Sequence, residues 1–121
     1  MARYRDAFPI LSVADMRRSL AFYRDLLGFE VQYAFPSEDE PGFASLSLPG
    51  GGKLGLGLNP EAKGGPFAAT WLYTDDVDQA VGELRDAGVE VKQEPVDQPW
   101  GERQATVVDP DGYDVHLGAG T

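Results

Sequence analysis

The chain has 121 residues, 42% of them apolar and none of them cysteine, and its formal net charge is −10. This length fits one ordinary domain or two very small halves. The composition excludes disulfides and cysteine chemistry, and the negative charge disfavours nucleic-acid binding because phosphates would be repelled. No apolar run reaches the roughly 18 residues that span a membrane, and the first residues lack the apolar core of a signal peptide, so we expect a cytoplasmic protein.

The first half of the chain predicts one helix among several strands. Asp15 is a good N-cap, and apolar residues then recur every three or four positions up to Leu27, which is the pattern of an amphipathic helix. Gly28 is placed to end this helix in the left-handed conformation. Alternating apolar residues predict strands at Phe8–Ala14, Phe29–Phe35, Phe43–Leu48 and Leu54–Leu58.

The second half predicts the same elements again, after a Gly- and Pro-rich connector at residues 59–66. Asp76 caps the second helix, Gln79 can complete a capping box, and Gly88 ends the helix. A tight turn at Asp109–Gly112 precedes the last strand, which carries the only histidine, His116. The strands are predicted at Phe67–Thr74, from Val89 onward, at Ala105–Val108 and at Tyr113–Leu117.

The two halves also match in their letters. Asp15, Arg24-Asp25 and Gly28 to Val31 correspond to Asp76, Arg85-Asp86 and Gly88 to Val91, at an offset of 61 residues and then 60. The sequence therefore predicts an α+β fold of two βαβββ modules, residues 7–58 and 67–118, joined by the linker 59–66 within one domain spanning 1–121. Neither half is large enough to bury a sheet face well alone, which favours packing the two together.

Alternation within each strand separates two faces. Leucine and valine residues on one face need burial under a helix: Leu11, Val13, Leu46, Leu48, Leu54, Leu56, Leu58, Leu72, Val115 and Leu117. The opposite face is aromatic where its side chains are large and is otherwise Gly, Ser or Ala, which makes a poor core but a good pocket lining. An alternative interpretation is that these aromatic residues fill a core or an interface between subunits.

Four segments make the chain similar to the vicinal oxygen chelate superfamily, which contains glyoxalases, bleomycin-resistance proteins and dioxygenases. They are Ser12–Phe29, Leu84–Val89, Pro99–Gly101 and Asp109–Gly112, in the order and spacing of the family. The resemblance covers essentially the whole chain. It implies that the eight strands form an open cup, and that the protein is a homodimer with its site at or near the subunit interface.

The resemblance also indicates where a metal would be held. Enzymes of this superfamily mostly use a divalent metal bound by the first strand of each module and by the last strand. Those positions are occupied here by Phe8, Phe67 and His116, and a phenyl ring has no lone pair to donate. Because a stable site needs about three protein ligands, we expect no metal and no other cofactor.

The closest resemblance is to the metal-free binding proteins of the bleomycin-resistance type. The hypothesis is a protein that sequesters a planar aromatic or cationic antibiotic or metabolite without catalysis. The acidic second half, with 12 acidic and 3 basic residues from Trp71 onward, would attract a cation, although it can equally serve solubility. The candidate ligand-binding residues are Phe8, Ile10, Phe43, Ser45, Phe67, Trp71, Tyr73, Trp100, Asp114 and His116.

Other classes of function stay open at this point. A metal-free lyase or isomerase could use His116 or Asp114 as general base. A side chain performs this role well when its pKa lies near the operating pH. A metal-dependent glyoxalase- or dioxygenase-like enzyme is a further alternative, as is a regulatory module that binds nothing. Trp100 could close over a ligand at the rim of the cup or could simply brace its own loop.

Overall fold

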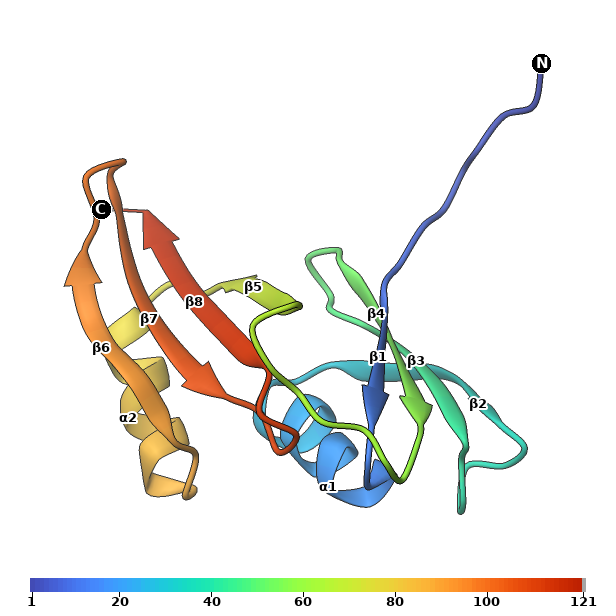
Figure 1. Ribbon diagram of the computed structural model, residues 1–121. Coiled ribbons are helices and arrows are strands. Elements are labelled where there is room, and N and C mark those ends of the chain that lie inside the picture. The colour runs from blue at the N-terminus through green and yellow to red at the C-terminus, as the bar shows by residue number, and fades with distance from the viewer. Residues whose placement is uncertain (121) are drawn as a thin grey trace. The chain divides into compact units, whose positions relative to one another are not determined.

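A computed structural model describes residues 1–120 and divides the chain into two compact units. The first unit is Met1–Lys63, and the second runs from Gly64 onward. Each unit contains one four-stranded sheet of mixed direction (Figure 1). In the described residues, no helix is long and apolar enough to cross a membrane.

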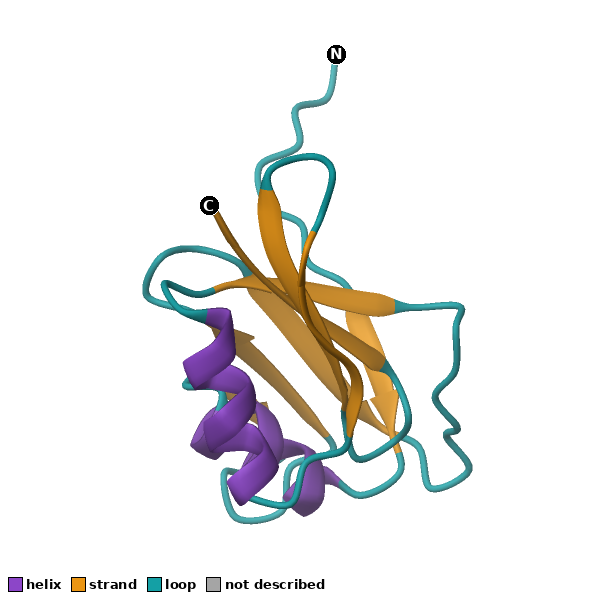
Figure 2. Ribbon diagram, turned by 90° about the vertical axis from the view of Figure 1, so that its left-hand side faces the viewer, coloured by secondary structure: helices purple, strands orange, loops and turns teal. Residues whose placement is uncertain are grey.

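The first unit has strand order β1-β4-β3-β2, with β1 parallel to β4 and the other pairs antiparallel. Asp15 Oδ1 accepts a hydrogen bond from the Arg18 backbone N–H at 3.2 Å, and Gly28 ends the helical region at φ 88°. Residues 1–9 precede β1 as an irregular, exposed segment (Figure 2). The elements are β1 Ile10–Val13, α1 Met16–Leu20, η1 Ala21–Leu26, β2 Glu30–Phe35, β3 Phe43–Ser47 and β4 Lys53–Leu58.

The predicted single α-helix is divided, because its second part, η1, is a π-helix. The wider π turn shifts which side chains face the sheet. Phe22 and Tyr23 are therefore both buried, whereas Leu27, which the helical stripe assigned to the buried face, is only half-buried.

The second unit repeats the topology of the first, with strand order β5-β8-β7-β6 and β5 parallel to β8. The α2 helix lies against one face of this sheet (Figure 1). The predicted α+β fold of two βαβββ modules is confirmed. The elements are β5 Ala69–Tyr73, α2 Val77–Asp86, β6 Val91–Asp97, β7 Glu102–Val108 and β8 Asp114–Gly120.

The helix-facing sides of both sheets form the cores that the alternation predicted. Val13, Leu56 and Val115 are completely buried, and complete burial of such a side chain contributes about 1.5–3 kcal/mol. The prediction is wrong for Leu58, which is 44% exposed, and Leu48 and Leu72 are only half-buried. Leu58 is the last residue of β4 and lines an open groove beside Met16 of α1, so the helix leaves it partly exposed.

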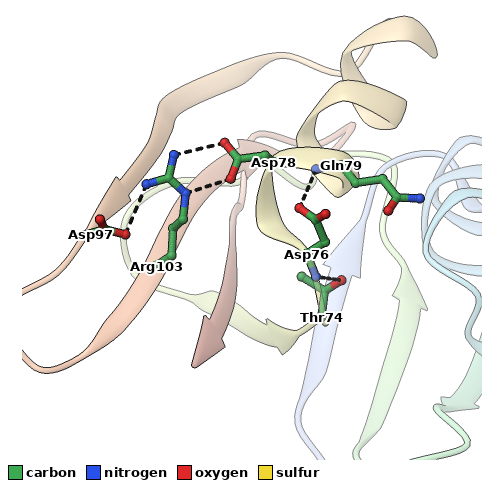
Figure 3. A network of polar contacts seen from close by, with 6 residues as sticks. All are labelled: Thr74, Asp76, Asp78, Gln79, Asp97 and Arg103. Atoms are coloured by element: carbon green, nitrogen blue, oxygen red, sulfur yellow. Dashed lines mark hydrogen bonds and ion pairs between the residues drawn. The ribbon is translucent and has the colours of Figure 1, made fainter. Parts of the chain in front are cut away.

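The N-terminus of α2 is capped in a different way from the predicted capping box (Figure 3). Asp76 Oδ1 accepts from the Gln79 backbone N–H at 3.0 Å, as expected. The Gln79 side chain, however, donates to Glu83 Oε2 at 3.5 Å instead of returning to Asp76. Thr74 Oγ1 accepts from the Asp76 backbone N–H at 3.4 Å and so takes the place of the missing half of the box.

Arg103 of β7 ties the sheet to α2 (Figure 3). Its guanidinium donates two hydrogen bonds to Asp78 of α2, at 2.7 and 3.0 Å, and a third to Asp97 at 3.1 Å. These hydrogen bonds, together with the positive charge of Arg103, hold the pKa of the Asp78 carboxyl below its usual value. Arg103 thereby shows which face of β7 the helix covers, and its neighbours Glu102 and Gln104 point to the other face.

Candidate functional site

Side chains of three strands gather on the face of the second sheet that α2 does not cover. Directly paired residues of neighbouring strands project from the same face, so the register defines rows across the sheet. One row joins Trp71, His116 and Thr106, and the next joins Tyr73, Gly118 and Gln104. We call this surface the aromatic-polar face; its side chains are those of Trp71, Tyr73, Glu102, Gln104, Thr106, Asp114 and His116.

The indole of Trp71 lies over Gly118. A Cβ atom added to Gly118 would be only 2.6 Å from Trp71 Cζ2 and 3.0 Å from its Nε1, so the absence of a side chain is what admits the ring. The ring centroid of Trp71 lies 5.7 Å from that of His116 and 6.0 Å from that of Tyr73. Trp71 is still 37% exposed, which leaves surface on which another planar group can stack.

His116 is held from one side by two buried residues of β7. Its Nδ1 lies 2.8 Å from Thr106 Oγ1 and 3.2 Å from Gln104 Nε2. Gln98, just after β6, donates through Nε2 to Gln104 Oε1 at 2.8 Å. The imidazole is therefore part of a chain of polar contacts that fixes its orientation, as buried polar groups require.

The turn before β8 sets the register that places His116 on this face. Asp109 Oδ1 accepts hydrogen bonds from the backbone N–H groups of Asp111 and Tyr113, both at 2.9 Å, and Gly112 has φ 97°. Asp109 is buried, so these two bonds are protected from water. The predicted tight turn is confirmed, with Gly112 in the left-handed conformation that other residues avoid.

Glu102 stands beside two exposed aromatic residues. Trp100, in the turn between β6 and β7, donates through Nε1 to Glu102 Oε1 at 2.8 Å. A hydrogen bond between Tyr73 and Glu102, and then the negative charge of Glu102, raise the pKa of the Tyr73 phenol. Trp100 is 59% exposed and Tyr73 70% exposed, so this carboxylate is framed by aromatic rings that are accessible to a ligand.

Asp114 shares the face with His116, but it is already paired. Lys92 Nζ donates to both of its carboxylate oxygens, at 2.9 and 3.0 Å. The Asp114 side chain is 21% exposed, whereas that of Lys92 is 55% exposed. The charges of Asp114 and Lys92 neutralise one another locally. Of the two carboxylates on this face, that of Glu102 is therefore less compensated than that of Asp114.

Four of the candidate residues belong to the first unit. Three of them meet over Gly55, where an added Cβ would lie 3.0 Å from Ile10, 3.1 Å from Phe8 and 3.2 Å from Phe43 side-chain atoms. Ser45, the fourth, pairs with Gly55 across the β3–β4 ladder. These residues thus form an apolar cluster, without a charged member, on the side of the first sheet opposite its buried leucines.

Phe67 does not join either group. It lies before β5 rather than within it, because the strand begins at Ala69 instead of at Phe67 as predicted. Its ring packs edge-on against Tyr113 with a centroid distance of 5.7 Å, and it remains 72% exposed. The structure therefore places Phe67 beside the turn before β8 and not in the rows of the aromatic-polar face.

Comparison with known proteins identifies the family. The model of the Glyoxalase/Bleomycin resistance protein/Dioxygenase superfamily matches residues 7–117. The chain belongs to this superfamily. A search of curated proteins gave no match.

Solved structures with the same fold match nearly the whole chain. A member from Sphaerobacter thermophilus is 28% identical, with a TM-score of 0.76 and coverage of 97% of this chain and 98% of that one. A bleomycin resistance determinant encoded on the transposon Tn5 is 23% identical, with a TM-score of 0.73 and coverage of 97% and 98%. TioX from Micromonospora sp. ML1 is 22% identical, with a TM-score of 0.77 and coverage of 98% and 100%. The last two comparisons support the fold alone.

The donor set for a superfamily metal does not fit. Among residues 1–120, no three His, Asp or Glu side chains lie close enough together to hold a metal ion. Two of the three expected positions are Phe8 and Phe67, which carry no donor atom. At the third, His116 is a single donor residue, which is too few for a stable site. We therefore derive no chemistry through a metal.

Three polar residues of the aromatic-polar face were missing from the sequence prediction: Glu102, Gln104 and Thr106. Glu102 and Gln104 were missed because β7 was predicted to begin at Ala105, whereas it begins at Glu102. Thr106 lay within the predicted strand, but the two faces of that strand were not assigned. The glutamate, arginine and glutamine before the apolar end of the strand look like a loop when the pattern is read for apolar residues alone. Continuing the period of two backward from Thr106 would have placed Gln104 and Glu102 on the same face as His116.

Proposed function

We propose that this member of the superfamily is a metal-free binding protein that sequesters a planar aromatic or cationic small molecule on its aromatic-polar face. The observation that carries the proposal is the indole of Trp71, held over Gly118 between His116 and Tyr73 and still partly exposed. A rigid, accessible indole with polar groups around it is the arrangement that orients a flat ligand.

Stacking on this face provides enough affinity for sequestration. A well-placed aromatic pair contributes about 0.5–1.5 kcal/mol beyond the burial of its area. Trp71, Tyr73 and Trp100 offer three such rings, all exposed by more than a third. Added to the burial of the ligand's own apolar surface, these contacts suffice for micromolar binding, about −8 kcal/mol.

Glu102 supports the cationic part of the proposal. A carboxylate has about four lone-pair sites, and the contacts from Trp100 and Tyr73 leave room for an ammonium group. The net charge of −9 from Trp71 onward, 12 acidic against 3 basic residues, would raise the rate of association with a cation. The neighbouring aromatic rings would add a cation–π contribution.

Binding without catalysis is favoured because both candidate bases already have partners. Asp114 forms two hydrogen bonds with Lys92, and His116 uses Nδ1 for Thr106 and Gln104. A general base must be within hydrogen-bond reach of the proton that it removes. The titratable group that contacts Asp114 is Lys92, which holds this carboxylate in a salt bridge.

We extend the proposal to a homodimer with the ligand site at or near the subunit interface. The first unit leaves Ile10, Tyr33 and Phe35 more than half exposed. Exposed apolar patches of this kind commonly mark the surface that a partner covers. Sedimentation or light scattering measures the oligomeric state directly, and a monomer over the working concentration range would contradict this part of the proposal.

Tryptophan fluorescence tests the binding, because the chain has only two tryptophans. W100F leaves Trp71 as the sole reporter, and W71F leaves Trp100. Each variant would be titrated with bleomycin, mitomycin C and a polycyclic cation such as proflavine, and the compound would be recovered for mass spectrometry. We expect saturable quenching in W100F with at least one compound, recovered unchanged.

Two outcomes would count against this function. If none of the three compounds gives saturable quenching in W100F, ligand binding at Trp71 is not supported. If a compound binds and is recovered chemically altered, the lyase or isomerase alternative replaces sequestration. In that case H116A and D114N would identify the base, because the altered product would disappear in the variant that lacks it.

A further inference from the structure

We propose that Gln98 and Gln104 are positioning residues that fix the proton of His116 on Nε2. His116 would then present an N–H donor to the ligand, which must carry a hydrogen-bond acceptor, such as a carbonyl or carboxylate oxygen, at that position. The part that concerns the ligand rests on the proposed function. The proton position is a property of the free protein and can be tested without any ligand.

The direction of the polar chain follows from the chemistry of its members. Gln98 Nε2 donates to Gln104 Oε1, so the amide of Gln104 is oriented with its NH₂ group toward His116. An amide NH₂ group can only donate a hydrogen bond. His116 Nδ1, 3.2 Å away, must therefore accept, and in a neutral imidazole the proton then sits on Nε2.

Burial protects the hydrogen bonds that run from Gln98 through Gln104 to His116, so that they constrain the orientation of the imidazole. Gln104 is 7% exposed and Thr106 is 4% exposed, so water has little access to the contacts around Nδ1. The Thr106 hydroxyl, 2.8 Å from Nδ1, can rotate to donate as well. If these hydrogen bonds ran in the opposite direction, the amide oxygen of Gln104 would face the imidazole. The Gln98 amide would then have to be reversed as well.

The other ring nitrogen is available to a ligand. Within residues 1–120, no hydrogen-bond partner of His116 Nε2 is present, since its contacts are those at Nδ1 and the ring contact with Trp71. Nδ1 is turned toward β7, so Nε2 lies on the opposite side of the ring from Gln104 and Thr106. A flat ligand stacked on Trp71 would bring its edge near this N–H group, because the two ring centroids are 5.7 Å apart.

Nitrogen NMR of the single imidazole tests the proton position directly. Protein labelled with ¹⁵N-histidine gives the resonances of one side chain, because His116 is the only histidine. In the neutral imidazole we expect Nδ1 to show the shift of an unprotonated ring nitrogen and Nε2 that of a protonated one. The reverse assignment, or an equal mixture of the two forms, would overturn the proposal.

Two substitutions test the roles of the glutamines. Q104E replaces the donating NH₂ group by an oxygen that can only accept when ionised, so Nδ1 should become protonated. Q98L removes the donor that orients Gln104 and should give a mixture of the two tautomers. Q32E, an exposed glutamine of β2 in the first unit, is the matched control and should leave the spectrum unchanged. A spectrum unaltered in both Q104E and Q98L would show that the two glutamines do not fix the proton of His116, even if one of the variants folds poorly.

A matched pair of compounds tests the acceptor. 2-(Aminomethyl)anthraquinone and 9-(aminomethyl)anthracene are both planar tricyclic cations, but only the first has carbonyl acceptors. By calorimetry we expect the wild type to bind the anthraquinone about five- to tenfold more tightly than the anthracene, which is what one net hydrogen bond contributes. We expect H116A to bind the two compounds with equal affinity. Equal affinity for the wild type would refute the acceptor requirement. Failure of both compounds to bind would count against the proposed function instead and would leave the NMR result standing.

Discussion

The two sheets have the same strand order and equivalent registers, yet their faces away from the buried leucines differ in chemistry. The position of His116 in the second sheet is that of Gly55 in the first. In the first sheet, apolar side chains close over the glycine, whereas in the second the imidazole is held by polar neighbours. The equivalent rows are Ile10–Gly55–Ser45 and Trp71–His116–Thr106.

This difference shows that the two units share the same sheet and buried core but not the same candidate site. The helix-facing side of each sheet must bury leucines and valines, so its composition is dictated by the hydrophobic effect in both units. The other face is free to differ, since it is not needed for the cores. The polar groups that can orient a ligand are concentrated in the second unit, and the first unit supplies an apolar surface.

Equivalent core substitutions should have the largest effect and should affect both units alike. Leu56 and Leu117 occupy matching positions on β4 and β8 and are 0% and 3% exposed. We expect L56A and L117A each to lower the free energy of unfolding by about 2–5 kcal/mol, because each leaves a cavity. Urea denaturation measures this, and a loss below about 1 kcal/mol in either variant would show that the helix-facing sides are not equivalent.

The glycines at matching positions should respond differently to the same substitution. G118A places a methyl group 2.6 Å from the Trp71 ring, whereas the methyl group of G57A meets Ile10 at 3.5 Å, an ordinary contact. We expect G118A to cost about 1–3 kcal/mol through overpacking and G57A to change stability by less than about 0.5 kcal/mol. Equal stabilities would show that Trp71 does not depend on Gly118 for its position.

Removal of the Trp71 side chain should weaken ligand binding, whereas removal of the equivalent side chain in the first sheet should not. W71A should weaken the binding of 9-(aminomethyl)anthracene about tenfold, because it removes a stacking partner and the area buried against it. I10A, at the equivalent position of the first sheet, should change the affinity by less than about twofold. Calorimetry on both variants tests this contrast, and a loss in I10A as large as that in W71A would place the apolar cluster in the site.

Titration of Tyr73 should give the smallest effect. Glu102 raises the pKa of the Tyr73 phenol, mainly through their hydrogen bond and then through its charge. The neutral phenol is thus favoured in the folded state, and this contribution to stability is lost as the pH rises through the raised pKa. We expect E102Q to shift one tyrosine ionisation to lower pH in an absorbance titration. The control E30Q, on β2, should leave the curve unchanged, and no shift in E102Q would contradict the Tyr73–Glu102 contact.

Much of the fold could be predicted because it depends on local patterns. Period-two alternation located the strands, Asp15 and Asp76 marked the starts of the helices, and the left-handed glycines marked their ends. The errors lie where the pattern is incomplete. The polar start of β7 carries no apolar signal, and the π-helical turn of η1 is not distinguished by a spacing of three and four residues.

The sequence by itself determined the repeat, the buried faces and the absence of metal-donor side chains at Phe8 and Phe67, because each follows from residue type and period. Only the tertiary structure decided which side chains meet. Gln104 and Thr106 reach His116 from another strand, and Trp71 lies over Gly118 because β5 and β8 pair in that register. Contacts between strands depend on register, and register is set by turns and by packing of the whole sheet.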